Sequence, residues 1–285
     1  MKVLITGSNG QLGRSIQERS LLYPEFSFDF TDVDQLDITN KSALEFYLKT
    51  SKPDVIINCA AYTAVDKAEE EKEKAFLLNV TAVEYLSQIS VEYGILLIHI
   101  STDFIFDGKS TKFYKEDNFA QPESVYGKSK LAGEKAIKDC GPNAIIIRTS
   151  WLYSEYGHNF VKTILRLASE RSEIKVVSDQ VGTPTYAGDL ADAILKIIHS
   201  NYQPEGVQVF HYSNEGVASW YDFAKAIIEI DNLDCSVIPI PASKYTLPAK
   251  RPDYSVMSKE KFKQYFHLEI PEWKESLKVC LKNLS

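Results

Sequence analysis

The N-terminal half of the chain alternates short apolar, β-branched runs with segments of helical periodicity. Strand-like runs cover residues 3–6, 26–30 and 55–58, and helical patterns lie between them at residues 16–22 and 44–48. This alternation is typical of βαβ units, in which helices connect parallel strands and cover both faces of the sheet. Two later runs, at residues 95–100 and 144–147, are almost wholly apolar, as fully buried parallel strands are. The sequence therefore predicts an α/β fold with a Rossmann-type, doubly wound parallel sheet.

The pattern changes beyond about residue 150. Turn-forming segments at residues 182–184, 203–206 and 238–241 separate short helices and isolated strands. We expect a sheet domain over residues 1–150 and a smaller C-terminal α/β region over residues 151–285, with the ligand cleft between them. No flexible linker separates the two parts, so the boundary is approximate and the chain can cross from one part to the other.

Charge and composition exclude several classes of protein. Lys and Arg number 32 against 39 Asp and Glu, a net charge of −7, so nucleic acid is not an expected partner. The apolar runs fall far short of the roughly 18 residues of a membrane-spanning helix, and we expect no membrane association. The four scattered cysteines form neither a disulfide pattern nor a zinc pattern, which favours reduced thiols in the cytoplasm.

Three glycines follow the first strand-like run and precede a helical pattern. Gly7, Gly10 and Gly13 form G-x-x-G-x-x-G, where the usual dinucleotide fingerprint is G-x-G-x-x-G. Glycines permit a tight turn and a close approach of backbone to pyrophosphate, which the positive end of the helix attracts. The alternative is an ordinary strand-to-helix turn. We predict a dinucleotide site here.

The second strand-like run is followed by three acidic residues. An acidic side chain at this point hydrogen-bonds the ribose of NAD, and the candidates are Asp32, Asp34 and Asp37. The segment has no arginine to hold the 2′-phosphate of NADP, although the hydroxyl of Ser8 or Thr31 could accommodate it. NADH and NADPH therefore both stay open.

A phenol and an ammonium group lie one helical turn apart at Tyr126 and Lys130. A fixed cation stabilises phenolate, so this spacing suits a tyrosine that donates or accepts a proton near neutral pH. By itself the pair could equally be a tyrosine and a lysine on a helix surface. Thr102 and Asp103 follow the buried run at 95–100, at the strand end where open α/β sheets place their chemistry. Thr102 is a candidate to hydrogen-bond a substrate carbonyl.

Together, the glycine loop, the Ser-Thr-Asp segment and the Tyr-x-x-x-Lys pair resemble the extended short-chain dehydrogenase/reductase family. Within it, segments 58–69, 101–108, 148–151 and 249–252 are similar to the dTDP-4-dehydrorhamnose reductase family, and the resemblance spans nearly the whole chain. It implies NAD(P)H-dependent reduction of the C4 ketone of dTDP-4-dehydro-L-rhamnose (dTDP-6-deoxy-L-lyxo-4-hexulose) to dTDP-L-rhamnose, the last step of dTDP-rhamnose biosynthesis. Residues 1–150 would then bind NAD(P) and residues 151–285 the nucleotide sugar.

The resemblance also assigns roles to individual residues. Tyr126 would donate a proton to the ketone oxygen, Lys130 would contact the nicotinamide ribose and lower the Tyr126 pKa, and Thr102 would orient the carbonyl. The cofactor-binding positions would be Gly7, Gly10, Gln11, Leu12 and Gly13 at the pyrophosphate, Asp37 and Ile38 at the adenine, and Ala61, Tyr62 and Thr63 at the ribose and nicotinamide. Asp103 and Trp151 would contact the sugar, and Arg251 would clamp the diphosphate. A structural tryptophan and an exposed surface arginine are the alternatives for Trp151 and Arg251.

Some positions depart from the family pattern. Cys59, Tyr62 and Phe104 replace residues that are usually Ala, His and Tyr. Some members bridge a homodimer through Mg²⁺ held by carboxylates, but the corresponding position here is Ser15, which weakens the case for a metal. Two other functions stay open: an NDP-sugar epimerase or dehydratase with tightly bound NAD, and a non-catalytic dinucleotide-binding regulatory subunit. The presence of Thr102, Tyr126 and Lys130 argues against the latter.

Overall fold

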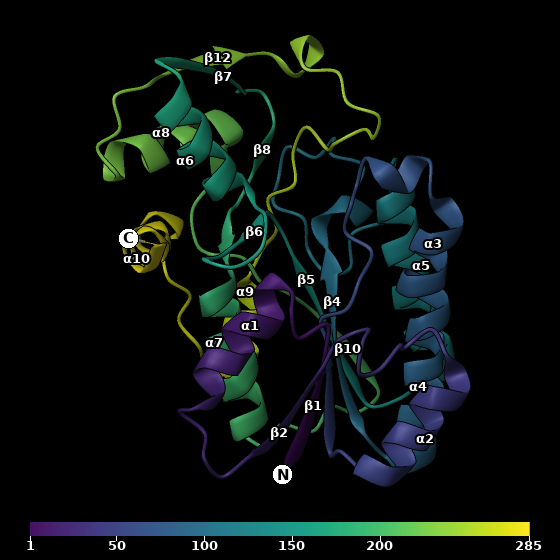
Figure 1. Cartoon of the computed structure of the whole chain (residues 1–285). Coiled ribbons are helices and arrows are strands. Elements are labelled where there is room, and N and C mark those ends of the chain that lie inside the picture. The colour runs from purple at the N-terminus through teal and green to yellow at the C-terminus, as the bar shows by residue number, and fades with distance from the viewer. Residues whose placement is uncertain (285) are drawn as a thin grey trace.

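A six-stranded parallel sheet forms the centre of the computed structural model, which describes residues 1–284 (Figure 1). The order across the sheet is β2-β1-β3-β4-β5-β10, and every neighbouring pair is parallel. The strands are β1 (Lys2–Thr6), β2 (Ser27–Thr31), β3 (Val55–Asn58), β4 (Leu96–Thr102), β5 (Ala144–Thr149) and β10 (Val207–His211).

Helices cover both faces of this sheet. Figure 1 shows α1 (Gln11–Ser20) and α7 (Ala187–His199) on one side, and α2 (Lys41–Ser51), α4 (Ala82–Tyr93) and α5 (Val125–Cys140) on the other. Successive strand residues point to opposite faces, so Val3 and Ile5 pack with α1 and α7, whereas Leu4 packs with α2 and α4. The predicted doubly wound sheet is confirmed.

The strand order reverses at β1. The chain passes from β1 to β2 on one side and then crosses to β3 on the other. The connections that leave the carboxyl ends of β1 and β3 therefore diverge, and such a switch point is where open α/β sheets bind ligands. The glycine loop follows β1, and residues 59–66 follow β3.

The segment between β3 and β4 also contains two short helices and a π-helical turn that pack near α5. These are η1 (Lys67–Glu69), α3 (Lys72–Phe76) and the π-helical turn η2 (Leu77–Thr81), followed by the longer α4. After β4 comes the short helix η3 (Asp103–Ile105). A π-helical turn inside a helix commonly marks a functional site.

The C-terminal part has a core of its own. Buried Tyr153, Tyr186, Phe223 and Trp273 pack among α6 (Phe160–Glu170), α8 (Trp220–Ile230) and α10 (Trp273–Leu284). Three pairs of short strands complete it: β6 (Leu152–Tyr153) with β9 (Thr185–Tyr186), β8 (Val181–Gly182) with β11 (Ala218–Ser219), and β7 (Glu173–Val177) with β12 (Ser236–Ile240). The chain meanwhile returns to the main sheet with α7 and β10, and η4 (Ala242–Lys244) and α9 (Glu260–Phe266) follow.

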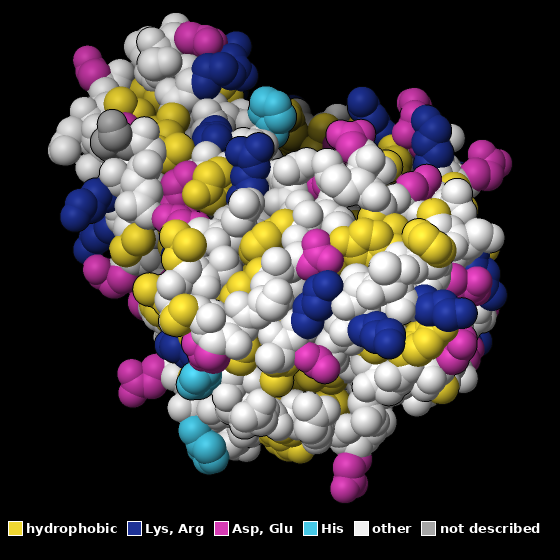
Figure 2. Space-filling model, turned by 60° about the horizontal axis from the view of Figure 1, so that its bottom comes forward, with side chains coloured by type: hydrophobic (Ala, Val, Ile, Leu, Met, Phe, Trp, Pro, Cys, Tyr) yellow, Lys and Arg dark blue, Asp and Glu magenta, His cyan; other side chains and the backbone are white. Residues whose placement is uncertain are grey.

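Two surface properties complete the description. On the face in Figure 2, basic and acidic side chains are interspersed with no continuous basic stripe. Within residues 1–284, no helix is both long enough and apolar enough to cross a membrane.

Candidate active site

The glycine loop after β1 has the geometry of a phosphate site. Gly7 has a φ of +66°, and a Cβ there would lie 2.6 Å from the backbone nitrogen of Ala60. A Cβ on Gly13 would lie 2.5 Å from the carbonyl oxygen of Gly7. Gly10 is the N-cap of α1, so no side chain satisfies the free N–H groups of the first turn. These residues fit a dinucleotide, because the uncapped backbone donors and the positive end of the α1 dipole lie at Gly10, which is exposed.

The two residues that follow the loop, at the start of α1, have side chains that contact the rest of the protein. The Gln11 amide donates to the Leu152 carbonyl at 3.3 Å, and its oxygen accepts from Asn159 Nδ2 at 3.0 Å. Leu12 is buried in the core beneath α1. The Gln11 side chain therefore links the glycine loop to the C-terminal part, and what both residues offer a ligand at the helix start is their backbone.

The acidic candidates after β2 differ in position. The Asp32 carboxylate accepts from the backbone N–H of Asn9 at 2.9 Å, so it lies against the glycine loop. Asp37 is exposed and accepts from the hydroxyl and N–H of Thr39, while Ile38 is buried under α2. Of the three aspartates, Asp32 is the one that contacts the loop.

Asn79 in η2 joins the segment after β3 to helix α5. Its Oδ1 accepts from the backbone N–H of Tyr62 at 2.8 Å, and its Nδ2 donates to the Tyr62 carbonyl at 3.1 Å and to Ser129 Oγ at 3.0 Å. Ala61 and Tyr62 are partly buried and Thr63 is exposed. These bonds bring residues 61–63 next to the helix that carries Tyr126 and Lys130.

Helix α5 begins close to the end of β4. Its N-cap Ser124 accepts from the N–H of Gly127, and Gly127 has no side chain to collide with the carbonyl of Phe104. The close approach places the Tyr126 ring edge-to-face with Phe104, with centroids 5.6 Å apart. Tyr126 thereby meets Thr102 and Asp103, the residues that end β4.

Burial is the main cause of the pKa shifts of Tyr126 and Asp103. It raises the pKa of Tyr126 to about 12, although the hydrogen bond with Thr102 acts in the opposite direction. Burial also raises the pKa of Asp103 to about 6, against hydrogen bonds from Ser255 and Thr102. Asp103 Oδ2 is buried without a hydrogen-bond partner among residues 1–284. An unsatisfied buried carboxylate oxygen at a sheet edge is a candidate acceptor for a ligand hydroxyl.

Lys130 is buried and fastened to β4. Its ammonium group donates to the Ile100 carbonyl at 2.7 Å and lies 3.2 Å from His99 Nε2. Burial lowers its pKa to about 8, against the attraction of Glu134 and Cys59. The predicted lowering of the Tyr126 pKa by Lys130 stays a prediction for the complex with coenzyme.

The aromatic pair Trp151 and Trp220 lies beyond the sheet edge, in the C-terminal part. Their rings stack with centroids 3.6 Å apart, and Trp151 has a left-handed backbone conformation with φ of +47°. A non-glycine residue in this region is strained, and such strain clusters at ligand sites. Gly182 leaves room for the Trp151 ring, because a Cβ there would lie 2.7 Å from it.

Arg251 is already paired. It donates to both carboxylate oxygens of Asp66, at 3.0 and 2.7 Å, and to the Ala249 carbonyl at 3.0 Å. The pair connects the segment after β3 with the segment before Pro252, and the arginine lowers the pKa of Asp66. The guanidinium is thus held in a fixed direction while its side chain stays 22% exposed.

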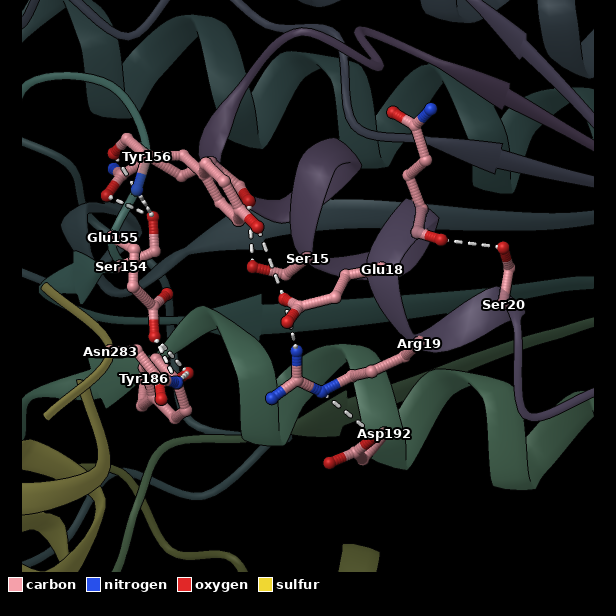
Figure 3. Close-up of polar contacts among 12 residues, drawn as sticks. Ser15, Glu18, Arg19, Ser20, Ser154, Glu155, Tyr156, Tyr186, Asp192 and Asn283 are labelled. Carbon is pink, nitrogen blue, oxygen red and sulfur yellow. Dashed lines mark hydrogen bonds and ion pairs between the residues drawn. The ribbon is translucent and has the colours of Figure 1, made fainter.

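Ser15 lies in a polar interface between α1, α7 and the C-terminal part (Figure 3). It is buried and donates to the Gln11 carbonyl at 3.0 Å. One turn further, Arg19 pairs with Asp192 of α7 at 3.0 Å, and Glu18 accepts from the Tyr156 hydroxyl at 3.2 Å. Residues 1–284 contain no cluster of three or more His, Cys, Asp or Glu that could hold a metal.

Four polar residues of this site were not singled out from the sequence. They are His99, Asn79, Glu134 and Arg148, all buried. Glu134 and Arg148 form a bidentate pair at 2.9 and 2.8 Å, and Ser101 donates to the same carboxylate at 2.6 Å. The available signal was a polar residue within an apolar strand, such as His99 in the run at 95–100.

Comparisons with known proteins agree with this geometry. The family model of the RmlD substrate binding domain matches residues 1–285. A dTDP-4-dehydrorhamnose reductase from Aggregatibacter actinomycetemcomitans is 41% identical over 286 residues, covering 97% of each chain.

Two solved structures are similar over their full length. The crystal structure of a dTDP-4-dehydrorhamnose reductase from Clostridium acetobutylicum has a TM-score of 0.94 and 43% identity, and covers 100% of this chain and 99% of its own. The enzyme of that name from Bacillus anthracis, crystallised with NADP, has a TM-score of 0.94 and 40% identity over 99% of both chains. This chain belongs to the dTDP-4-dehydrorhamnose reductase family.

Proposed function

We propose that this chain reduces the C4 ketone of dTDP-4-dehydro-L-rhamnose to dTDP-L-rhamnose with NADPH or NADH. The observation that carries the proposal is the meeting of Tyr126 with Thr102 at the carboxyl end of β4, with Lys130 one turn further along the same helix and bonded to the same strand. Full-length similarity to reductases of this name supports the substrate. The relative crystallised with NADP supports NADPH as one coenzyme.

Each catalytic residue has a role that its surroundings favour. The reduced nicotinamide coenzyme, when bound, supplies the hydride to C4. Tyr126 keeps its proton until a ketone oxygen with developing negative charge accepts it, since burial makes the free phenolate costly. Thr102, which forms a hydrogen bond with the Tyr126 phenol, would orient the substrate carbonyl. The Lys130 cation would stabilise the Tyr126 phenolate that remains after proton transfer.

Coenzyme binding is assigned to the first part of the chain. The backbone of Gly7, Gly10, Gln11, Leu12 and Gly13 would hold the pyrophosphate, and Asp37, Ile38, Ala61, Tyr62 and Thr63 would border the adenosine and nicotinamide ends. We add Asp32 as the acidic residue nearest the glycine loop, since it binds the loop backbone. Its carboxylate would favour the free ribose hydroxyl of NADH over the 2′-phosphate of NADPH.

Substrate binding is assigned to residues from both parts. Asp103 would accept from a sugar hydroxyl, Trp151 backed by Trp220 would pack on the sugar ring, and Arg251 would bind the diphosphate. The proposal includes a cytoplasmic place of action, in keeping with the four free cysteines, and a homodimer as the assembly.

The test mixes purified protein with dTDP-4-dehydro-L-rhamnose and follows NADH and NADPH oxidation in parallel by absorbance. UDP- and GDP-linked 4-keto-sugars serve as controls. Oxidation with the dTDP-sugar alone supports both reaction and substrate. Measurable coenzyme binding with no oxidation by any keto-sugar contradicts the proposal and favours a bound-NAD epimerase or a regulatory subunit.

A further inference from the structure

A chain of buried polar side chains runs from Lys130 into the parallel sheet. Lys130 Nζ lies 3.2 Å from His99 Nε2, and His99 Nδ1 lies 3.0 Å from Asn58 Nδ2. The Asn58 side-chain oxygen accepts from the Thr6 hydroxyl at 2.7 Å. His99, Asn58 and Thr6 are each at most 1% exposed. Donors and acceptors must therefore match along the whole chain, because an unmatched buried group is costly.

The direction of the Asn58 amide is fixed by a backbone group. The N–H of Ala60 points at Asn58 Oδ1, 3.2 Å away, and an N–H can only donate. The Thr6 hydroxyl meets the same oxygen. The amide nitrogen, which carries only donors, is consequently the atom that faces His99 Nδ1. His99 Nδ1 must accept.

This acceptor role decides the state of the imidazole. Burial and the neighbouring Lys130 lower the pKa of His99 well below its usual value, which keeps the ring neutral. A neutral imidazole that accepts at Nδ1 carries its hydrogen on Nε2. That hydrogen points at Lys130 Nζ, whose other partner is the Ile100 carbonyl at 2.7 Å.

The arrangement disfavours a protonated Lys130. An ammonium group has donors but no acceptor. It could not accept a hydrogen bond from the Nε2–H of His99, and the two N–H groups would repel each other. A neutral amine can donate to Ile100 and accept from His99 with its lone pair. We propose that His99, held as its Nε2–H tautomer by Asn58, is a positioning residue that weakens the hold of Lys130 on its proton, so that the catalytic ammonium form is lost at a lower pH than it would be without this neighbour. Its importance for turnover rests on the proposed function.

The other groups around Lys130 do not supply this effect. Glu134, one turn further on α5, raises the Lys130 pKa, but its two oxygens are shared with Arg148 and Ser101. Cys59, beyond β3, has a thiol pKa raised by burial to about 12 and stays neutral. Tyr126 on α5 is also neutral, with its pKa raised to about 12. Burial lowers the Lys130 pKa to about 8. The proposed effect of the His99 Nε2–H acts in the same direction as burial.

The first test reads the tautomer directly in the ligand-free protein. A long-range proton–nitrogen correlation spectrum of ¹⁵N-labelled protein resolves the five histidines, and His99 is assigned by the signals lost in His99→Gln or His99→Asn. We expect a neutral His99 with its hydrogen on Nε2 at neutral pH and above. A hydrogen on Nδ1, or an imidazolium, overturns the proposal. No substrate is involved, so this result is independent of the proposed reaction.

The second test measures the consequence for Lys130. In His99→Gln, the glutamine amide can turn its oxygen toward the Lys130 ammonium and accept a hydrogen bond from it. Because this bond stabilises the ammonium, the alkaline limb of the kcat/KM profile should move to higher pH by about one unit. Thr6→Val is the matched control, because it removes one buried hydroxyl while Ala60 still fixes the Asn58 amide. In Thr6→Val, the His99 tautomer and the alkaline limb of the kcat/KM profile should match those of the wild type. An unmoved limb in His99→Gln, with folded protein by circular dichroism, overturns the proposal.

Discussion

Arg251 and Asp66, 185 positions apart in the chain, form a bidentate ion pair with N–O distances of 3.0 and 2.7 Å. The pair joins the segment after β3 to the segment that precedes Pro252. A guanidinium held by one carboxylate fork is oriented before any diphosphate arrives. The pair therefore joins two segments to which we assign coenzyme and substrate contacts in our proposal.

Substitution of Arg251 should raise the KM for the dTDP-sugar. A lysine keeps the charge but cannot bind two oxygens with a planar fork, so we expect Arg251→Lys to raise KM about tenfold with little change in kcat. Steady-state kinetics measure both constants. Arg171→Lys, an exposed arginine at the end of α6, is the control and should leave both unchanged. A fall in kcat with unchanged KM would contradict a role in ground-state binding.

Tyr126→Phe should abolish most of the turnover and leave coenzyme binding intact. Removal of the hydroxyl removes the proton donor, and a lost general acid costs about 10²–10⁴-fold in rate. The measurements are kcat from absorbance and coenzyme affinity from fluorescence titration. Tyr85→Phe, a partly buried tyrosine of α4 beside Lys41, is the matched control and should keep full activity. Near-normal kcat in Tyr126→Phe would remove Tyr126 from the catalytic role.

Gly13→Ala should weaken coenzyme binding. The added Cβ would lie 2.5 Å from both Gly7 O and Ser8 Cα, so the loop that faces the pyrophosphate must shift. We expect at least about a tenfold increase in Kd, which corresponds to about 1.4 kcal/mol. Ser20→Ala, at the other end of α1, controls for a general effect on the helix. Equal affinity of Gly13→Ala and wild type would place the coenzyme elsewhere.

Asp103→Asn should stabilise the fold in a pH-dependent manner. The folded-state pKa of about 6 lies above the ordinary aspartate value of 3.8, so the folded chain binds more protons than the unfolded chain between these values. The free energy of unfolding of the wild type therefore falls as pH rises through this window, by about 2–3 kcal/mol. Asparagine carries no charge, so the free energy of unfolding of Asp103→Asn should not show this fall.

Urea unfolding at pH 4 and pH 7 tests this effect. The stability of Asp103→Asn relative to wild type should increase between the two pH values, and its activity should fall because a ligand acceptor is lost. A relative stability that is the same at both pH values would show that Asp103 is not held against ionisation.

The sheet could be predicted from the sequence because its strands are buried on both faces. Continuous apolar runs at 95–100 and 144–147 leave little choice but a parallel layer between helices. The return of α7 and β10 to this layer was not predicted in detail, because β10 pairs with β5 through contacts between residues more than sixty positions apart. Local periodicity does not report such pairing.

The site was predicted unevenly, for a related reason. Tyr126 and Lys130 share one helix, so their spacing is visible in the sequence. The contacts of Lys130 with His99 and Ile100, and of Arg251 with Asp66, depend on tertiary folding. The burial that raises the pKa of Asp103 also comes from packing. Sequence therefore indicated the groups that we propose as reacting, and the structure supplies the partners that shift their pKa values.

The fate of the hydride distinguishes a reductase from an enzyme that recycles a bound coenzyme. Purified protein is incubated with dTDP-4-dehydro-L-rhamnose and coenzyme carrying deuterium on the transferable face of nicotinamide C4, and the product is examined by NMR and mass spectrometry. We expect one deuterium at C4 of dTDP-L-rhamnose for each coenzyme oxidised. Sugar conversion without deuterium and without net oxidation of free coenzyme would contradict it, because only an enzyme that recycles a bound coenzyme behaves in that way.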